Sequence, residues 1–129
     1  MANQEKTDNF TRLVQIIARL RDDNGCPWDR KQTAESLKKY LIEETEELAE
    51  AIDSGNTDHI KEEAGDLFYL LILLSMIHED EGLFTLKEVL AGISEKMIRR
   101  HPHVFAGRKT GNESELRQQW EKIKLCEKH

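Results

Sequence analysis

Cysteine, proline and long apolar runs are all scarce in this 129-residue chain. Its two cysteines, Cys26 and Cys126, lie far apart and outside any CxxC or Cys/His ligand spacing, which excludes a disulfide scaffold and a zinc site of that type. The first ten residues lack the apolar core of a signal peptide. The most apolar run, residues 67–77, has 11 residues, well short of the roughly 20 that cross a bilayer. We therefore expect a cytoplasmic protein with reduced thiols and no membrane association.

Positive charge is scarce in the middle of the chain. Residues 43–66 contain ten acidic residues and one base, Lys61, so this window carries −9, against −6 for the whole chain and +3 for the remainder. No basic stripe with interleaved aromatic residues occurs elsewhere. An acidic centre of this kind repels a free nucleic acid, so we expect no direct nucleic-acid binding. A small polyanion bridged by a metal ion remains compatible with it.

The composition favours a helical fold. The chain has two prolines, 34% charged residues and 38% hydrophobic residues, which is typical of a globular, strongly helical protein. At this length we expect a single domain over residues 1–129, with its core over about 9–125. Apolar residues at helical spacing predict helices over 9–21, 33–54, 57–78, 85–101 and from 112 onward, with a turn-rich connector at 22–29 and a loop at 106–112. We predict an all-α fold, a compact bundle of four or five helices.

Capping residues predict where these helices begin. The expected caps are Asp8 or Asn9, Thr85 with Glu88, and Asn112 with Glu115. The short connection at residues 54–56 makes the second and third helices antiparallel neighbours. The third helix is apolar on nearly every side, so it needs cover that one small bundle can hardly supply. We therefore expect self-association through this helix.

Acidic residues occupy the apolar faces of the second and third predicted helices. At about 100° per residue, Glu44 lies inside the stripe of the second helix and Glu47 lies on its edge. Glu63 lies in the middle of the stripe of the third helix, with Asp66 one turn on. The two stripes consist of Leu37, Leu41, Leu48, Ala51 and Ile52, and of Ile60, Leu67, Leu70, Leu74 and Ile77. Ionised carboxylates are costly to bury without a partner, and a bound divalent cation is the simplest partner.

The ligand chemistry indicates which cation and which reaction. An oxygen-only set suits Mg²⁺ or Mn²⁺ and does not suit zinc or copper. Because Mg²⁺ usually also holds water and substrate phosphates, the pattern EExxE followed by ExxD indicates phosphoryl or nucleotidyl chemistry. A ferritin-like di-iron site would need a Glu-x-x-His pair, and position 66 is Asp. A non-catalytic interaction module with a structural Mg²⁺ or Ca²⁺ site is the alternative from a different class. For Glu43, a solvated helix face and a functional role are equally compatible.

Lys96, Arg99 and Arg100 form a basic cluster near the end of the fourth predicted helix. Basic residues there offset the helix dipole, which suffices to explain Arg99. Lys96 and Arg100 have their stems beside or within the apolar stripe, and their head groups could bind phosphates held by the metal. His101 and His103 fit packing or a carbonyl hydrogen bond better than a metal pair.

Five blocks of the sequence carry a resemblance to a known family. They are GCPWD (25–29), LIEETEE (41–47), EAGD (63–66), RRHPHVF (99–105) and WEKIK (120–124). Together they closely resemble the MazG family of nucleoside triphosphate pyrophosphohydrolases, over roughly residues 13–124. The acidic pattern alone would be moderately specific, and the flanking blocks make the resemblance strong.

The resemblance implies an all-α fold that assembles as a dimer or a higher oligomer, such as a tetramer. It also implies Mg²⁺-dependent hydrolysis of nucleoside triphosphates to monophosphate and pyrophosphate, a housecleaning reaction of the nucleotide pool. The implied metal ligands are Glu44, Glu47, Glu63 and Asp66, with Glu43 behind them or orienting the attacking water. The implied substrate contacts are Lys96 and Arg100 on the triphosphate and Trp120 with Lys124 over the nucleotide. Some members carry two such domains in tandem and this sequence has one, so roles that need a second copy do not transfer. A base-selective dUTP or dCTP pyrophosphatase is a related alternative.

Overall fold

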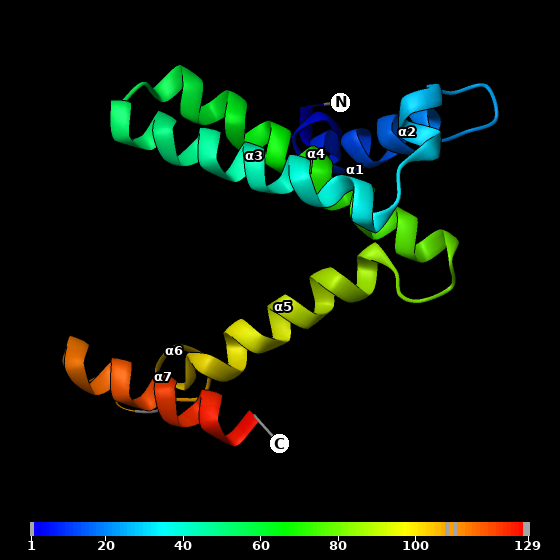
Figure 1. The fold of residues 1–129 in the computed structure, drawn as a ribbon. Helices are drawn as coiled ribbons and strands as arrows, with labels where there is room; N and C mark the ends of the chain where they lie inside the picture. Colours follow the sequence, from blue (N-terminus) through cyan, green and yellow to red (C-terminus); the bar gives the residue numbers. More distant parts are fainter. Residues whose placement is uncertain (1, 108, 110, 128–129) are drawn as a thin grey trace. The chain divides into compact units, whose positions relative to one another are not determined.

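The computed structural model describes residues 2–107, 109 and 111–127, with side chains from residue 9 onward (Figure 1). Every regular element in these residues is an α-helix, which confirms the predicted all-α class. The helices are α1 (Ala2–Leu20), α2 (Pro27–Lys31), α3 (Ala34–Ser54), α4 (Thr57–Asp80), α5 (Leu86–Arg100), α6 (Pro102–Phe105) and α7 (Glu113–Glu127). The chain divides into two compact units, Met1–Leu86 and Lys87–His129, and each is described by itself.

The antiparallel pair α3 and α4 forms the frame of the first unit (Figure 1). α3 begins with a capping box, in which the Thr33 hydroxyl accepts a hydrogen bond from Ser36 N at 3.1 Å and the Ser36 hydroxyl accepts one from Thr33 N at 2.9 Å. α3 ends at Gly55, whose φ of 71° lies in the left-handed region that glycine adopts without a steric penalty. Asn56 then caps α4 by accepting a hydrogen bond from His59 N at 3.2 Å. The predicted bounds of this helix pair are confirmed to within two residues.

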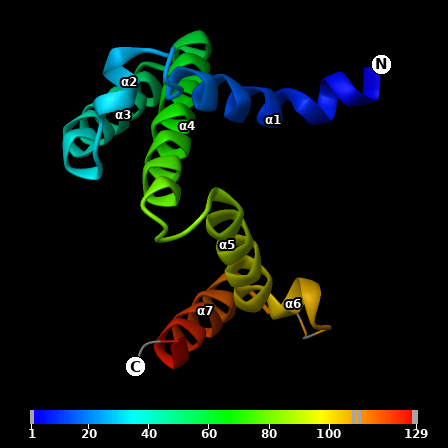
Figure 2. The same ribbon diagram turned by 90° about the vertical axis from the view of Figure 1, so that its right-hand side faces the viewer.

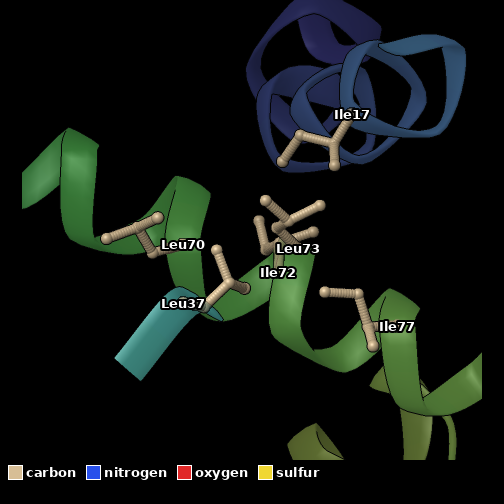
Figure 3. Close-up of a cluster of buried hydrophobic side chains, with 6 residues drawn as sticks. All are labelled: Ile17, Leu37, Leu70, Ile72, Leu73 and Ile77. Atoms are coloured by element: carbon tan, nitrogen blue, oxygen red, sulfur yellow. The ribbon is translucent and has the colours of Figure 1, made fainter. Parts of the chain in front are cut away.

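The core of the first unit lies where α1 crosses α4 and α3 packs alongside (Figures 2 and 3). Its buried side chains are Ile17, Leu37, Leu70, Ile72, Leu73 and Ile77. Four of these six belong to α4, the helix predicted to be apolar on nearly every side. On the same helix Phe68 is 55% exposed and Leu71 is 48% exposed. The helix therefore presents apolar surface beyond the core that it supplies.

A buried polar contact connects α2 with α4. Asp29, which is 4% exposed, accepts a hydrogen bond from the Tyr69 hydroxyl, and Arg21 Nη1 donates to the Asp29 carbonyl at 2.6 Å. Burial and the neighbouring Asp29 carboxylate raise the pKa of Tyr69 well above its ordinary value, so the hydroxyl stays protonated as a donor. The turn that leads into α2 requires Gly25, because a Cβ there would lie 2.1 Å from the Leu20 carbonyl oxygen.

Three helix starts differ from the predictions. α1 begins at Ala2, so Asp8 and Asn9 lie inside it and do not cap it; the helix-forming residues 4–6 (QEK) allow this earlier start. α2 begins at Pro27, inside the predicted connector, and α6 begins at Pro102, directly after the predicted end of α5. Proline is favoured at the first position of a helix, where its missing N–H costs nothing. Both short helices have too few residues for a periodic pattern to reveal them.

The second unit contains α6, α7 and α5 from Lys87 onward (Figure 2). Asn112 Oδ1 accepts a hydrogen bond from Glu115 N at 2.9 Å, which confirms one of the two hydrogen bonds in the predicted capping box of α7. Neither α5 nor α7 contains a buried residue. Among all the described helices, none combines the length and apolar character that crossing a membrane requires.

Candidate functional site

An acidic cluster forms on the facing sides of α3 and α4. Glu44 lies near the middle of α3, and Glu63 and Asp66 lie one turn apart on α4. Each offers a carboxylate oxygen, and these oxygens all lie within 4.8 Å of one another. Three of the four carboxylates that were predicted to meet across the helix pair therefore do so. Glu44 and Glu63 are partly buried and Asp66 is exposed, so the cluster is open to solvent on one side.

The electrostatics of this acidic cluster are those of a site that lacks positive charge. Glu44 Oε2 and Glu63 Oε2 are buried and have no hydrogen-bond partner among the described residues. Burial raises the pKa of Glu44 from 4.5 to about 7, with further contributions from the neighbouring carboxylates of Glu63, Glu47 and Asp66. A proton on Glu44 near neutral pH therefore supplies part of the positive charge that the chain does not.

The residues of the acidic cluster fit a hard divalent cation. All three donors are carboxylate oxygens, which Mg²⁺, Mn²⁺ and Ca²⁺ accept and softer metals do not prefer. A buried oxygen without a partner costs free energy that coordination would recover. A cation would also remove the mutual repulsion that raises the pKa of Glu44. The geometry thus supports a divalent metal site, and the choice of Mg²⁺ among these ions follows from the reaction proposed below.

Glu43 and Glu47 stand apart from the three-carboxylate group in the described structure. Both are exposed on α3, and neither belongs to the set whose oxygens lie within 4.8 Å of one another. Glu47 is nevertheless near enough for its charge to raise the pKa of Glu44. The predicted roles of Glu47 as a metal ligand and of Glu43 in orienting water stay predictions.

Three of the four predicted substrate-binding residues meet in the second unit. The Arg100 guanidinium carbon lies 5.6 Å from the centre of the Trp120 ring, and Lys124 Nζ lies 4.7 Å from it. Both distances are typical of cation–π interactions, so two positively charged groups lie close to the Trp120 ring. Lys96 is partly buried and lies one turn before Arg100 on α5. The end of α5 and the adjoining side of α7 thus form a second, positively charged cluster.

Glu127 is a candidate functional residue that the sequence motifs did not indicate. Arg100 donates to Glu127 Oε1 from Nη2 at 2.8 Å and from Nε at 3.3 Å, and Arg99 Nε donates to Glu127 Oε2. The hydrogen bonds from Arg99 and then from Arg100 lower the pKa of Glu127 to about 2. Glu127 lies seven residues after Trp120 and therefore on the same face of α7, but Glu113 lies seven residues before Trp120, so this spacing alone did not select Glu127.

A cavity of about 260 Å³ lies beside the Trp120 ring. It is lined by Arg100, His101, His103, Leu116, Arg117 and Trp120. His101 Nδ1 lies 2.6 Å from the Met97 carbonyl oxygen, which confirms the predicted carbonyl hydrogen bond, and His103 Nδ1 lies 3.2 Å from the Gln119 amide nitrogen. A flat aromatic wall next to guanidinium groups suits a ligand that joins a planar ring to an anion.

The helical fold and the acidic cluster define an all-α protein with a candidate site for a hard divalent cation. Comparison with known proteins gives the family. Residues 32–105 match the MazG nucleotide pyrophosphohydrolase domain, and the chain belongs to this family. The resemblance carried by the five sequence blocks is therefore confirmed.

Several bacterial proteins are similar over nearly the whole chain. The "Uncharacterized protein YabN" of Bacillus subtilis is 53% identical over 93% of this chain and 24% of its own length. The nucleoside triphosphate pyrophosphohydrolase/pyrophosphatase MazG of Thermotoga maritima is 50% identical over 92% of this chain and 45% of its own length. The nucleoside triphosphate pyrophosphohydrolase of Escherichia coli is 42% identical over 94% and 46%. The chain thus spans between about a quarter and about half of these relatives.

A solved structure shares the fold. The crystal structure of a mazG-related protein from Thermotoga maritima aligns with a TM-score of 0.74 at 33% identity. The alignment covers 89% of this chain and 98% of that chain, so the two have nearly the same extent.

Proposed function

We propose that the chain hydrolyses nucleoside triphosphates, in ribose or deoxyribose form, to the nucleoside monophosphate and pyrophosphate, with Mg²⁺ as the cofactor. The observation that carries this proposal is the pair of buried carboxylate oxygens, on Glu44 and Glu63, without a partner in the described residues. Membership of the MazG family supports the reaction, and so do the names of the Thermotoga and Escherichia relatives. The cellular role would be housecleaning of the nucleotide pool.

The acidic cluster would hold the cation through Glu44, Glu63 and Asp66, together with Glu47. When bound, Mg²⁺ neutralises charge on phosphate oxygens and lowers the pKa of a bound water, and Mn²⁺ suits the same ligands. Glu44 would give up its proton when a cation binds, because the cation would offset the burial and the neighbouring negative charges that raise the pKa of Glu44. Glu43 would orient the water that attacks the α-phosphorus.

Residues of the second unit would bind the substrate. Lys96 and Arg100 would contact the triphosphate and stabilise the charge that develops on the departing pyrophosphate. Trp120 and Lys124 would close over the nucleotide. The support for this assignment is the approach of Arg100 and Lys124 to the Trp120 ring, which gathers an aromatic face and two positive charges in one place.

The experiment that tests the proposal measures release of pyrophosphate and monophosphate from the common ribo- and deoxyribonucleoside triphosphates, including dUTP, with Mg²⁺ and with EDTA. Glu63→Gln should lower turnover by about 100-fold, while circular dichroism shows a retained fold. Glu62→Gln is the matched control, because it removes the same charge from an exposed neighbour on α4. Equal turnover in wild type and Glu63→Gln would contradict the proposal.

The same assay separates two alternatives. A non-catalytic module with a structural metal site would turn over no triphosphate, and Glu63→Gln would lower its melting temperature together with its metal binding. A base-selective pyrophosphatase would hydrolyse dUTP or dCTP and leave the other triphosphates intact.

We further propose a cytoplasmic homo-oligomer, either a dimer or a tetramer. Within the first unit, Phe68 and Leu71 of α4 are about half exposed, and in the second unit Ile93 and Ile98 of α5 are 47% and 50% exposed. Exposed apolar clusters commonly mark contacts between proteins. Light scattering at micromolar concentration should give a mass of two or four times the 15.0 kDa of one chain. A monomer under these conditions would contradict this part of the proposal.

A further inference from the structure

The Glu127 carboxylate is hydrogen-bonded to the guanidinium groups of Arg99 and Arg100 at the end of α5. Its Oε1 accepts from Arg100 Nη2 at 2.8 Å and from Arg100 Nε at 3.3 Å, and its Oε2 accepts from Arg99 Nε. The side chains of Arg100 and Glu127 are 14% and 21% exposed, whereas that of Arg99 is 50% exposed. One carboxylate therefore spans two guanidinium groups in a partly enclosed place.

This contact imitates the way a phosphate binds arginine. Arg100 donates twice to one oxygen of Glu127 and Arg99 donates to the other, so charge-assisted hydrogen bonds of the kind that arginine also offers to phosphate oxygens hold both oxygens of the carboxylate. Glu127 uses the Nε–Nη2 edge of Arg100, and the Trp120 ring lies beside the same guanidinium at 5.6 Å. A phosphate can bind this edge of Arg100 only after Glu127 has left it.

The position of Glu127 argues against a role in stabilising its own helix. It is the last residue of α7, where the negative end of the helix dipole disfavours a carboxylate. Arg99 and Arg100 end α5, where the dipole favours a positive charge without help. The hydrogen bonds from both arginines lower the pKa of Glu127 to about 2, so the carboxylate stays charged throughout the neutral range.

We propose that Glu127 is an internal competitor for phosphate at Arg99 and Arg100, and that it weakens the binding of the triphosphate and of the pyrophosphate product. The inference rests on the proposed function, which puts the triphosphate on Arg100. Exchange between the carboxylate and a phosphate keeps the guanidinium groups paired before and after each turnover. Return of Glu127 to the arginines then favours departure of pyrophosphate.

The test is a titration of the full chain with inorganic pyrophosphate by calorimetry, in EDTA so that metal plays no part. Glu127→Gln keeps the size of the side chain and removes its charge. The dissociation constant for pyrophosphate should fall about fivefold, the scale of a partly exposed ion pair. Glu121→Gln is the control, because it removes the same charge from an exposed position on the same helix and should leave the constant unchanged.

Kinetics give a readout that a purely structural role would not move. In Glu127→Gln, KM should fall and inhibition by pyrophosphate should strengthen, while kcat does not rise. Unchanged or weaker pyrophosphate binding in this variant overturns the inference, and so does the absence of pyrophosphate binding in every variant. If pyrophosphate binds the variant more tightly but no triphosphate is hydrolysed, the inference holds and the proposed function fails. If the wild type hydrolyses triphosphates but Glu127→Gln binds pyrophosphate no more tightly than the wild type does, the proposed function holds and the inference fails.

Discussion

The acidic cluster of α3 and α4 and the basic cluster of α5 and α7 solve the same electrostatic problem in opposite ways. In the described structure Glu44 and Glu63 each keep a buried oxygen without a partner, whereas Arg99 and Arg100 share the carboxylate of Glu127. The acidic cluster depends on a proton or a metal ion from outside the chain. The basic cluster carries its own counter-charge, so a ligand there must exchange with a residue. A ligand of the acidic cluster would therefore add to groups that have no partner, whereas a ligand of the basic cluster would have to displace Glu127.

The two units differ in burial as well as in charge. The first unit encloses Ile17, Leu37 and Leu73 completely, whereas α5 and α7 contain no buried residue. The stability of the first unit is therefore expected to reside in its core.

The largest effect is expected from breaking that core. Leu73→Ala removes a side chain with no exposed surface, and it should lower the free energy of unfolding by about 3 kcal/mol. Leu90→Ala, at a position that is 42% exposed on α5, should cost less than about 1 kcal/mol. Chemical denaturation followed by circular dichroism measures both. If both substitutions lowered the free energy of unfolding equally, Leu90 would be buried in solution, and the two units would not differ in burial.

Glu44→Gln sharpens the contrast in charge. Turnover should fall by about 100-fold, because one of the carboxylates that hold the cation is gone. The metal-free protein should become more stable by about 1 kcal/mol at pH 8, since an amide can donate to Glu63 where an ionised carboxylate repels it. Thermal melting in EDTA measures this gain, with Glu46→Gln, exposed on the same helix, as the control. A loss of metal-free stability would show that the cluster is not repulsive.

The pH dependence of metal binding should follow the proton on Glu44. Its pKa rises from 4.5 to about 7 on folding, so the metal-free protein loses stability as the pH rises through this window. Below pH 7 a cation must displace the proton, and Mg²⁺ should bind about tenfold more weakly at pH 6 than at pH 8. Titration of Mg²⁺ at both values tests this. The difference should shrink in Glu44→Gln, and a difference that persists unchanged there would assign it to another group.

The smallest effects are expected at the helix caps, one in each unit. Asn56→Ala removes the acceptor for His59 N at the start of α4, and Asn112→Ala removes the acceptor for Glu115 N at the start of α7. Each should cost about 1 kcal/mol of local stability. Hydrogen exchange should show each loss confined to its own unit, and a loss that spreads to both would mean that the two unfold together.

Local sequence patterns were sufficient to predict the helix pair and its acidic face. The helical period put Glu44 and Glu63 among apolar residues, and the predicted break at residues 54–56 corresponds to the left-handed Gly55 and the capping Asn56. These are contacts within one turn or one facing pair, which periodicity and capping rules describe.

Contacts between distant residues were beyond those patterns. Glu127 pairs with arginines 27 and 28 positions away, and no local rule selects one glutamate of α7 as their partner. The early start of α1 was missed because residues 2–8 contain almost no apolar residues that could show a helical period, and α2 and α6 were missed because helices of four or five residues are too short to show one. Glu127, which neutralises part of the basic cluster, therefore could not be identified from the sequence.

The buried contact between Asp29 and Tyr69 has a consequence for how this sequence can drift over evolution. The two residues are 40 positions apart; loss of Tyr69 would leave the buried Asp29 carboxylate without this donor, and loss of Asp29 would leave the partly buried Tyr69 hydroxyl without its acceptor. Tyr69 also follows Asp66 by three residues, so the contact helps to set how α4 is rotated about its axis. A single neutral substitution at either position is therefore improbable, and an alignment of relatives should show the two positions changing as a pair.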